Sequence, residues 1–159
     1  MTQTVHFSNL PEVFDAAESL FSEVKLRIRE KLPHAEIEHI GSTAVRGRLT
    51  KGDLDVLVRV SRDDFRESDR ALESLFGRNE GSDRTATFAA FQDSSTSPEL
   101  GVQLVVAGTE FDTFSQWVSR LLSDRDLQAA YDDLKARYHG KRMSEYREAK
   151  SKFIAENIL

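Results

Sequence analysis

The hydrophobic positions of this chain follow helical spacing in some segments and strand spacing in others, and their order predicts a small sheet flanked by helices. Residues 11–31 carry apolar side chains at helical intervals, with Pro11 in a first-turn position and Pro33 just beyond the end. The predicted buried face of this helix comprises Phe14, Ala17, Phe21, Val24, Leu26 and Ile28. Shorter apolar runs predict strands at residues 35–40, 54–60, 84–91 and 101–106. The run at 54–60 is apolar enough for a central strand.

Helices are predicted both between these strands and after them. The segment from Ser61 to Asp64 has the Ser-x-x-acid form of a helix start, and Gly77 is the expected end of that helix. After the last strand, apolar stripes predict three more helices, within residues 111–122, 127–138 and 146–154. The element order predicts an α/β (α+β) fold, in which a small mixed sheet is flanked by helices and a helical C-terminal third completes the core.

Length and composition narrow the class of protein. The 159 residues are most simply one domain spanning 1–159, and 39% hydrophobic with 31% charged residues is typical of a soluble globular protein. No apolar run approaches the roughly 18 residues that a membrane-spanning helix needs. The N-terminus lacks the pattern of a secretory signal, so we expect a cytoplasmic protein. The chain contains no cysteine, which excludes disulfides and thiolate zinc sites.

The balance of charge also restricts the partners. The net charge is −5, from 27 acidic and 22 basic residues, which argues against broad nucleic-acid binding because such binding depends on neutralising phosphates. A local basic patch of Arg46, Arg48 and Lys51 remains. We therefore expect any polyanion-facing charge to be local.

The segment from His39 to Val58 contains the residues best suited to chemistry. A predicted strand leads into Gly41 and Ser42, where glycine allows the backbone to approach a ligand and the hydroxyl and N–H groups can bind phosphate. In isolation the same dipeptide is typical of an ordinary turn. The next strand opens with Asp53 and Asp55, and because they are two residues apart their side chains point to the same face.

This acidic pair predicts a cation site. Neighbouring carboxylates repel each other unless a proton or a cation lies between them, and Mg²⁺ shared with substrate phosphates suits oxygen ligands. The alternative is a solvated strand end. Asp55 is followed by the apolar run Val56-Leu57-Val58, however, where an unpaired charge is costly. We therefore predict that Asp53 and Asp55 bind metal.

The nearby basic and histidine residues have more than one interpretation. Arg46, Arg48 and Lys51 either hold the phosphates, which arginine can engage with two parallel donors, or neutralise the two aspartates as structural ion pairs. His39 is expected to be a hydrogen-bonded strand histidine, and no residue is assigned as a general base.

The string His39-Ile-Gly-Ser-Thr-Ala-Val-Arg-Gly-Arg-Leu-Thr-Lys-Gly-Asp-Leu-Asp-Val-Leu-Val resembles the GrpB family, a branch of the nucleotidyltransferase superfamily. Residues 130–135 and 146–154 resemble the closing helices of that family. Together with the strand around 102–106, the resemblance covers most of the chain.

The resemblance implies a nucleotidyltransferase-like fold and a site made of a Gly-Ser turn, a pair of acids and a third carboxylate on a later strand. Such acids bind two divalent cations, which position a nucleoside triphosphate and activate an attacking hydroxyl. Gly41 and Ser42 match the phosphate turn, and Asp53 and Asp55 match the metal pair. Lys150 belongs to the terminal motif, where it either reaches the nucleotide or lies in solvent.

The chain departs from the pattern at several positions. Family members often carry an apolar residue in place of Asp53, and the usual proline is Arg46. The strand expected to supply the third carboxylate offers Gln103, a poorer metal ligand. Glu99 or Asp93 are the nearby acids that could substitute for it. The second metal position is therefore in question.

The sequence thus predicts a Mg²⁺-dependent nucleotidyltransferase that transfers a nucleoside monophosphate from a nucleoside triphosphate to a hydroxyl acceptor. Asp53 and Asp55 are the predicted metal ligands and catalytic residues. The predicted nucleotide-binding residues are Gly41, Ser42, Arg46, Arg48, Lys51 and Lys150. The alternatives are a domain that binds a nucleotide or another phosphorylated ligand without turnover, which Gln103 favours, and a scaffold with a relict site. The nucleotide preference, the acceptor and the oligomeric state leave no mark in the sequence.

Overall fold

The computed structural model describes residues 3–112, 120 and 123–158. Its α-helices are α1 (Pro11–Lys31), α2 (Phe65–Glu73), α4 (Arg125–Tyr138) and α5 (Met143–Ile158). Its strands are β1 (Glu36–Ile40), β2 (Leu54–Val60), β3 (Gly77–Arg78), β4 (Phe88–Asp93) and β5 (Leu100–Val106). Two short 3₁₀ turns, η1 (Ser42–Ala44) and η2 (Glu110–Asp112), complete the described elements.

The strands form one mixed sheet in the order β1-β2-β5-β4-β3. β2 and β5 are parallel, whereas the other neighbouring strands are antiparallel. β2 is therefore a central strand, and its bounds are those predicted from the apolar run. The predicted mixed α/β architecture is confirmed.

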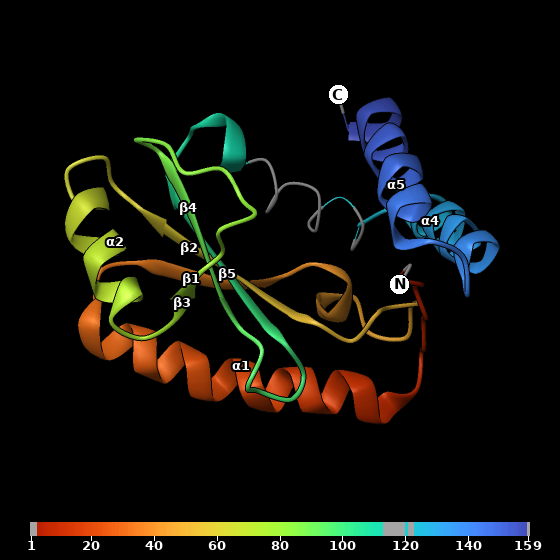
Figure 1. Ribbon diagram of the computed structural model, residues 1–159, viewed down its shortest axis with the longest axis horizontal. Coiled ribbons are helices and arrows are strands. Elements are labelled where there is room, and N and C mark those ends of the chain that lie inside the picture. The colour runs from red at the N-terminus through yellow and green to blue at the C-terminus, as the bar shows by residue number, and fades with distance from the viewer. Residues whose placement is uncertain (1–2, 113–119, 121–122, 159) are drawn as a thin grey trace.

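The two faces of the sheet are covered differently. α1 runs along one face and α2 packs on the same side (Figure 1), where both contribute to the main core with alternate residues of β2 and β5. The opposite face carries a smaller apolar cluster of Ile40, Leu57, Phe88 and Val105. Asp55 and Gln103 belong to this second face because they alternate with the core residues Val56 and Val102.

α1 has the predicted bounds and nearly the predicted buried face. Phe14, Ala17, Val24 and Ile28 are buried, but Leu26 is 68% exposed, so its assignment to the buried face was wrong. Leu26 lies two residues from both Val24 and Ile28, which is about 200° around a helix. The helix ends at Lys31, and Pro33 follows as predicted.

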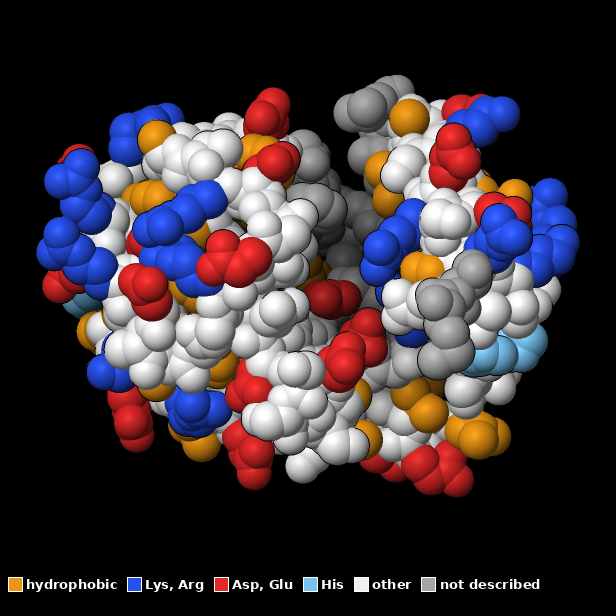
Figure 2. Space-filling model, in the orientation of Figure 1, with side chains coloured by type: hydrophobic (Ala, Val, Ile, Leu, Met, Phe, Trp, Pro, Cys, Tyr) orange, Lys and Arg blue, Asp and Glu red, His pale blue; other side chains and the backbone are white. Residues whose placement is uncertain are grey.

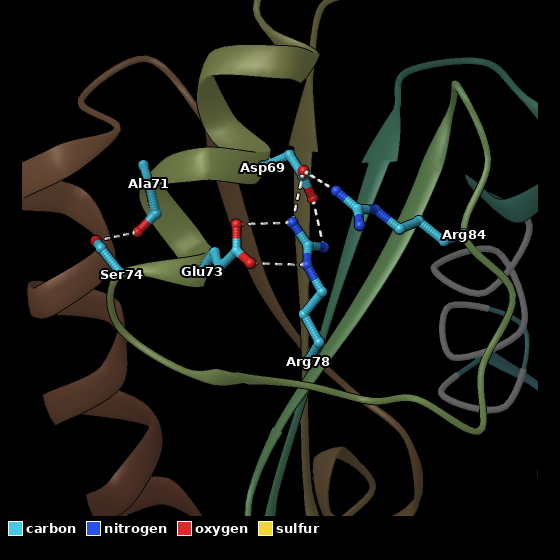
Figure 3. Close-up of polar contacts among 6 residues, drawn as sticks. All are labelled: Asp69, Ala71, Glu73, Ser74, Arg78 and Arg84. Carbon is cyan, nitrogen blue, oxygen red and sulfur yellow. Dashed lines mark hydrogen bonds and ion pairs between the residues drawn. The ribbon is translucent and has the colours of Figure 1, made fainter.

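α2 ends earlier than the sequence predicts. It stops at Glu73, where the Ser74 hydroxyl donates to the Ala71 carbonyl, and Gly77 begins β3 instead of ending the helix. Figure 3 shows Arg78 of β3 between Asp69 and Glu73 of α2, with a bidentate contact of 2.9 and 2.8 Å to Asp69. This ion pair links the helix to the strand that follows it.

The start of β4 also differs from the prediction. The strand begins at Phe88 and not at Arg84. The Thr85 hydroxyl accepts a hydrogen bond from the Thr87 N–H, which holds the preceding residues in a bend. Arg84 itself contacts Asp69 at 3.1 Å, from outside the sheet (Figure 3).

The C-terminal helices pack on each other beside the sheet (Figure 1). Residues 113–119, 121 and 122 of the predicted helix within 111–122 lie outside the described residues, and Glu110–Asp112 form a 3₁₀ turn. α4 begins at Arg125 and is capped by Asp124, whose carboxylate accepts from the Leu127 N–H at 2.9 Å. The N-terminal segment forms isolated bridges with the residue before α5, between Thr4 and Arg142, and with the loop before β2, between Ser8 and Thr50. None of the helices in the described part of the chain has the length and apolarity required to cross a bilayer.

Candidate functional site

The carboxylate of Asp55 lies between Gly41, which directly follows β1, and Gly101 of β5. A Cβ added to Gly41 would come within 2.5 Å of Asp55 Oδ2, and one added to Gly101 within 3.0 Å of Oδ1. Gly41 also has a φ of 78°, a conformation that favours glycine. Asp55 pairs with Gly101 on β5 and with Ile40, the residue before Gly41, on β1. The two glycines therefore form a recess for this carboxylate.

The turn after β1 is held by buried hydroxyl groups. The Thr43 hydroxyl donates to the Asp53 carbonyl at 3.0 Å, so that it accepts from His39 Nε2 at 2.8 Å. The Ser42 and Thr50 hydroxyls are 2.6 Å apart, and Thr50 also accepts from the Gly52 N–H. The bond to Thr43 agrees with the hydrogen-bonded strand histidine expected from the sequence, and burial lowers the pKa of His39. These bonds fix the backbone on which Ser42 and Asp53 sit.

The acidic pair and two lysines interact electrostatically. Burial raises the pKa of Asp55 and the charge of Asp53 acts in the same direction, while Lys150 and Lys51 oppose the rise. Lys51 Nζ lies 3.9 Å from Asp53 Oδ2. The structure thus brings together four residues that the sequence selected, from β2, the preceding loop and α5. The sequence places Lys150 almost 100 residues after the aspartates, so this proximity depends on the tertiary structure.

The surface is hollowed between the part that holds the sheet and the part that holds α4 and α5 (Figure 2). Acidic side chains gather on the sheet side of this hollow, and lysine or arginine side chains face them from the helices. Burial lowers the pKa of Lys51, and the positive charges of Lys150 and Arg147 act in the same direction. A ligand in this position meets carboxylates on one wall and ammonium or guanidinium groups on the other.

The two arginines of the basic loop have partners other than the aspartates. Arg46 contacts Asp15 and Glu18 of α1 at 2.8 and 3.0 Å. Arg48 contacts Gln128 and Asp132 of α4 at 3.0 and 3.4 Å. The sequence left open whether these arginines form ion pairs with Asp53 or Asp55, and neither of them does.

The two acids that could substitute for a third carboxylate, both among the described residues, are not grouped with Asp53 and Asp55 as a metal site. Asp93 alternates with Gln92 on β4 and belongs to the face covered by α1, opposite to Asp55. Its carboxylate accepts from the Ser95 N–H and hydroxyl, which lowers its pKa. Glu99 is exposed and lines an open hollow with Lys51 and Asp53. Among the residues that the structure describes, no three histidine, aspartate or glutamate side chains are grouped as a metal site.

Lys135 is a residue that the sequence reasoning missed. It is 2% exposed, donates from Nζ to the Leu49 carbonyl and lies 4.0 Å from the centre of the Tyr131 ring. Asp132, one turn earlier on α4, accepts from the Leu49 N–H at 3.2 Å. Lys135 and Asp132 of α4 therefore bind the carbonyl and the N–H of Leu49, respectively. The sequence could have indicated its burial, because Lys135 lies next to the apolar stripe of the helix predicted within 127–138.

Stability is expected to rise with pH because of Lys135. Burial lowers its pKa to about 7 from the ordinary 10.5. Between these values the unfolded chain binds the proton and the folded chain does not, so the free energy of unfolding increases by up to about 1.4 kcal/mol per pH unit. Urea unfolding at pH 7.5 and 9.5 should show a rise of about 2 kcal/mol that Lys135→Met largely removes. Lys25→Met, at an exposed lysine of α1, should keep it. An unchanged slope in Lys135→Met would contradict this assignment.

The sequence of this chain matches a known protein family over most of its length. The family model described as GrpB protein matches residues 11–158. The chain belongs to the GrpB family. It is 34% identical over 157 residues to a UPF0157 protein of Vibrio cholerae, covering 98% of this chain and 82% of that protein.

Solved structures agree on the fold. The GrpB protein of Enterococcus faecalis matches with a TM-score of 0.71 and 18% identity, over 94% of this chain and 95% of that one. Cid1 poly(U) polymerase with MgGTP bound matches with a TM-score of 0.50 and 14% identity, over 77% of this chain and 41% of that one. This GrpB chain therefore has a nucleotidyltransferase-like fold, as the resemblance implied.

Proposed function

We propose that this GrpB protein binds a nucleoside triphosphate with Mg²⁺ and transfers the nucleoside monophosphate to a hydroxyl acceptor. The observation that carries the proposal is the Asp55 carboxylate, held between Gly41 and Gly101 and coupled to Asp53, Lys51 and Lys150. Paired carboxylates next to ammonium groups suit a cation that is shared with phosphates. The likeness of the fold to a polymerase with MgGTP bound supports the same chemistry.

The donor set fits a divalent cation. Asp53 and Asp55 offer oxygen ligands, and the recess formed by the two glycines holds the Asp55 oxygens at the surface of the sheet. When bound, Mg²⁺ would offset negative charge on the triphosphate and on the departing pyrophosphate. Lys51 and Lys150 would neutralise the remaining phosphate charge from the loop and from α5. Ser42 would lie at the phosphate turn.

The reaction is a displacement at the α-phosphorus. The acceptor oxygen forms a bond to this phosphorus as the bond to the bridging oxygen breaks, and pyrophosphate leaves. The acceptor proton passes to solvent, because no side chain is assigned as a base. The role of the protein is to position the triphosphate and to offset its charge.

A second candidate function is nucleotide binding without turnover. Gln103 and the absence of a three-carboxylate group among the described residues favour it. Calorimetric titration with ATP, GTP, CTP and UTP, with and without Mg²⁺, tests both functions. Metal-dependent binding is expected in either case, whereas pyrophosphate release on adding candidate acceptors is expected of the transferase alone. No binding of any of the four nucleotides would refute both.

Lys150→Met is expected to weaken nucleotide binding about tenfold, because a charged hydrogen bond to phosphate contributes about 1.5–3 kcal/mol, part of which Lys51 compensates. The matched control is Lys152→Met on the same helix, since that side chain is 77% exposed and lies 4.0 Å from Glu156. Calorimetry with the preferred nucleotide should separate the two variants. Equal affinities would place the triphosphate away from α5.

A further inference from the structure

Thr50 lies in the loop before β2, where two distant parts of the chain hold the backbone. Its N–H donates to the Ser8 carbonyl at 2.9 Å, and its carbonyl accepts from the Ser8 N–H at 2.8 Å. The preceding residue, Leu49, is bound at its N–H by Asp132 and at its carbonyl by Lys135. The N-terminal segment and α4 therefore fix the direction in which the Thr50 side chain points.

The Thr50 hydroxyl points to the Gly41–Ser42 turn. Thr50 is 1% exposed, and its hydroxyl oxygen accepts from the Gly52 N–H at 3.0 Å and lies 2.6 Å from the Ser42 hydroxyl oxygen. A hydroxyl group has one hydrogen to donate. Among the residues that the structure describes, Thr50 has no acceptor for this hydrogen other than Ser42.

Burial decides which of the two hydroxyls donates. A buried donor without an acceptor loses its hydrogen bond to water and gains none in return, so such groups are disfavoured. In the described part of the chain, the amide oxygen of Gln103 is the one buried side-chain nitrogen or oxygen without a partner. Ser42 is partly exposed, so its own hydrogen can point to solvent or to a ligand. The arrangement that leaves no buried donor unpaired has Thr50 as the donor and Ser42 as the acceptor.

The direction of this bond matters for a phosphate at the turn. Phosphate oxygens are acceptors, so a hydroxyl contributes to their binding by donating its hydrogen. A Ser42 hydroxyl that donated to Thr50 would present only lone pairs to the phosphate. With Thr50 as the donor, the hydrogen of Ser42 remains available to the ligand.

We propose that Thr50 is a positioning residue for nucleotide binding, whose hydroxyl donates to Ser42 and leaves the hydrogen of Ser42 to a phosphate oxygen of the triphosphate. This inference rests on the proposed function and adds to it a residue that acts through Ser42. Because Leu49 and Thr50 are held by α4 and by the N-terminal segment, the orientation of the Ser42 hydroxyl depends on segments far from it in the sequence.

Thr50→Val keeps the shape of the side chain and removes its hydroxyl. Calorimetric titration with ATP, GTP, CTP and UTP in the presence of Mg²⁺ should show that the preferred nucleotide binds about fivefold more weakly, because one hydrogen bond loses its alignment. Thr50→Ser retains a hydroxyl and should recover the affinity that Thr50→Val loses. The control Ser68→Ala removes a buried hydroxyl on α2 and should bind as the native chain does.

Ser42→Ala distinguishes positioning from a purely structural role. In that background Thr50→Val should have no further effect on affinity, because the hydroxyl that Thr50 orients is gone. A loosened loop would also displace Lys51 and Asp53, and would weaken binding in both backgrounds. Equal losses in the two backgrounds, or native affinity in Thr50→Val, would overturn the proposal. No binding of any of the four nucleotides by the native chain would refute the proposed function as well.

The direction of the bond can also be measured in the native chain, which keeps the test independent of whether Thr50→Val folds. A buried hydroxyl hydrogen in a hydrogen bond is protected from exchange with water and gives its own NMR signal. Thr50 should give such a signal in the chain without nucleotide, and Ser42 only after the preferred nucleotide and Mg²⁺ are added. A protected Ser42 hydroxyl hydrogen in the nucleotide-free chain would overturn the proposal.

Discussion

Asp55→Asn is expected to reduce Mg²⁺-dependent nucleotide binding at least about 100-fold and to abolish pyrophosphate release, because it removes the charge that the cation requires. Asp55 is the carboxylate enclosed by Gly41 and Gly101, whereas Asp93 lies on the opposite face of the sheet. Titration of the preferred nucleotide with and without Mg²⁺ gives the measurement. Asp83→Asn, an exposed acid before β4, should bind as the native protein does.

The same substitution should stabilise the protein. Burial raises the pKa of Asp55, so the folded state favours its protonated form. This contribution to stability is present below the ordinary pKa of 3.8 and is lost as the pH rises through the folded-state value. At pH 7 Asp55→Asn should therefore raise the free energy of unfolding, as urea unfolding would show. Loss of binding with gain of stability would distinguish a functional carboxylate from a structural one. Native binding in Asp55→Asn would exclude the proposed cation site.

Gly41→Ala is expected to destabilise the protein by about 3 kcal/mol, since a Cβ would lie 2.5 Å from Asp55 Oδ2 and the backbone has a φ of 78°. Gly47→Ala is the matched control. Gly47 has a φ of 85° but no atom within 4 Å of its added Cβ, so it should cost only the backbone strain of about 1–2 kcal/mol. The difference between the two free energies of unfolding isolates the contact with Asp55.

A double substitution checks the origin of that difference. Asp55→Ala removes the oxygen that the new Cβ would meet, so Gly41→Ala should cost less in the Asp55→Ala background than in the native chain. Equal costs for Gly41→Ala and Gly47→Ala, or no coupling between positions 41 and 55, would show that the recess tolerates a methyl group. The role of Gly41 would then be limited to its turn.

The local elements of this fold could be predicted because each depends on spacing within one segment. The bounds of α1 and β2 follow from apolar periodicity and from the prolines around the helix. The errors occur where a distant residue decides the outcome. α2 ends at Glu73 and β3 begins at Gly77, and the next residue, Arg78, binds back to Asp69 and Glu73 of the helix. Leu26 is exposed because only one side of α1 meets the sheet.

The same distinction between local and distant residues applies to the candidate site. Asp53, Asp55 and the Gly41–Ser42 turn could be selected from the sequence, because strand alternation and the resemblance to GrpB concern neighbouring residues. The partners of Arg46 and Arg48 could not, since they lie on α1 and α4. The burial of Lys135 and the unpaired oxygen of Gln103 also appear only when separate segments pack together. The single domain over 1–159 and the cytoplasmic location stay predictions.

The sequence by itself determined the family, the central strand with its two aspartates and the glycine turn that precedes them. These features depend on side-chain order within a few residues, which the chain carries wherever it lies in space. Only the tertiary structure decided which cations face the aspartates, which face of the sheet each acid occupies and which polar atom is left without a partner. Such relations arise when segments far apart in the chain exclude water between them, and no local pattern encodes them.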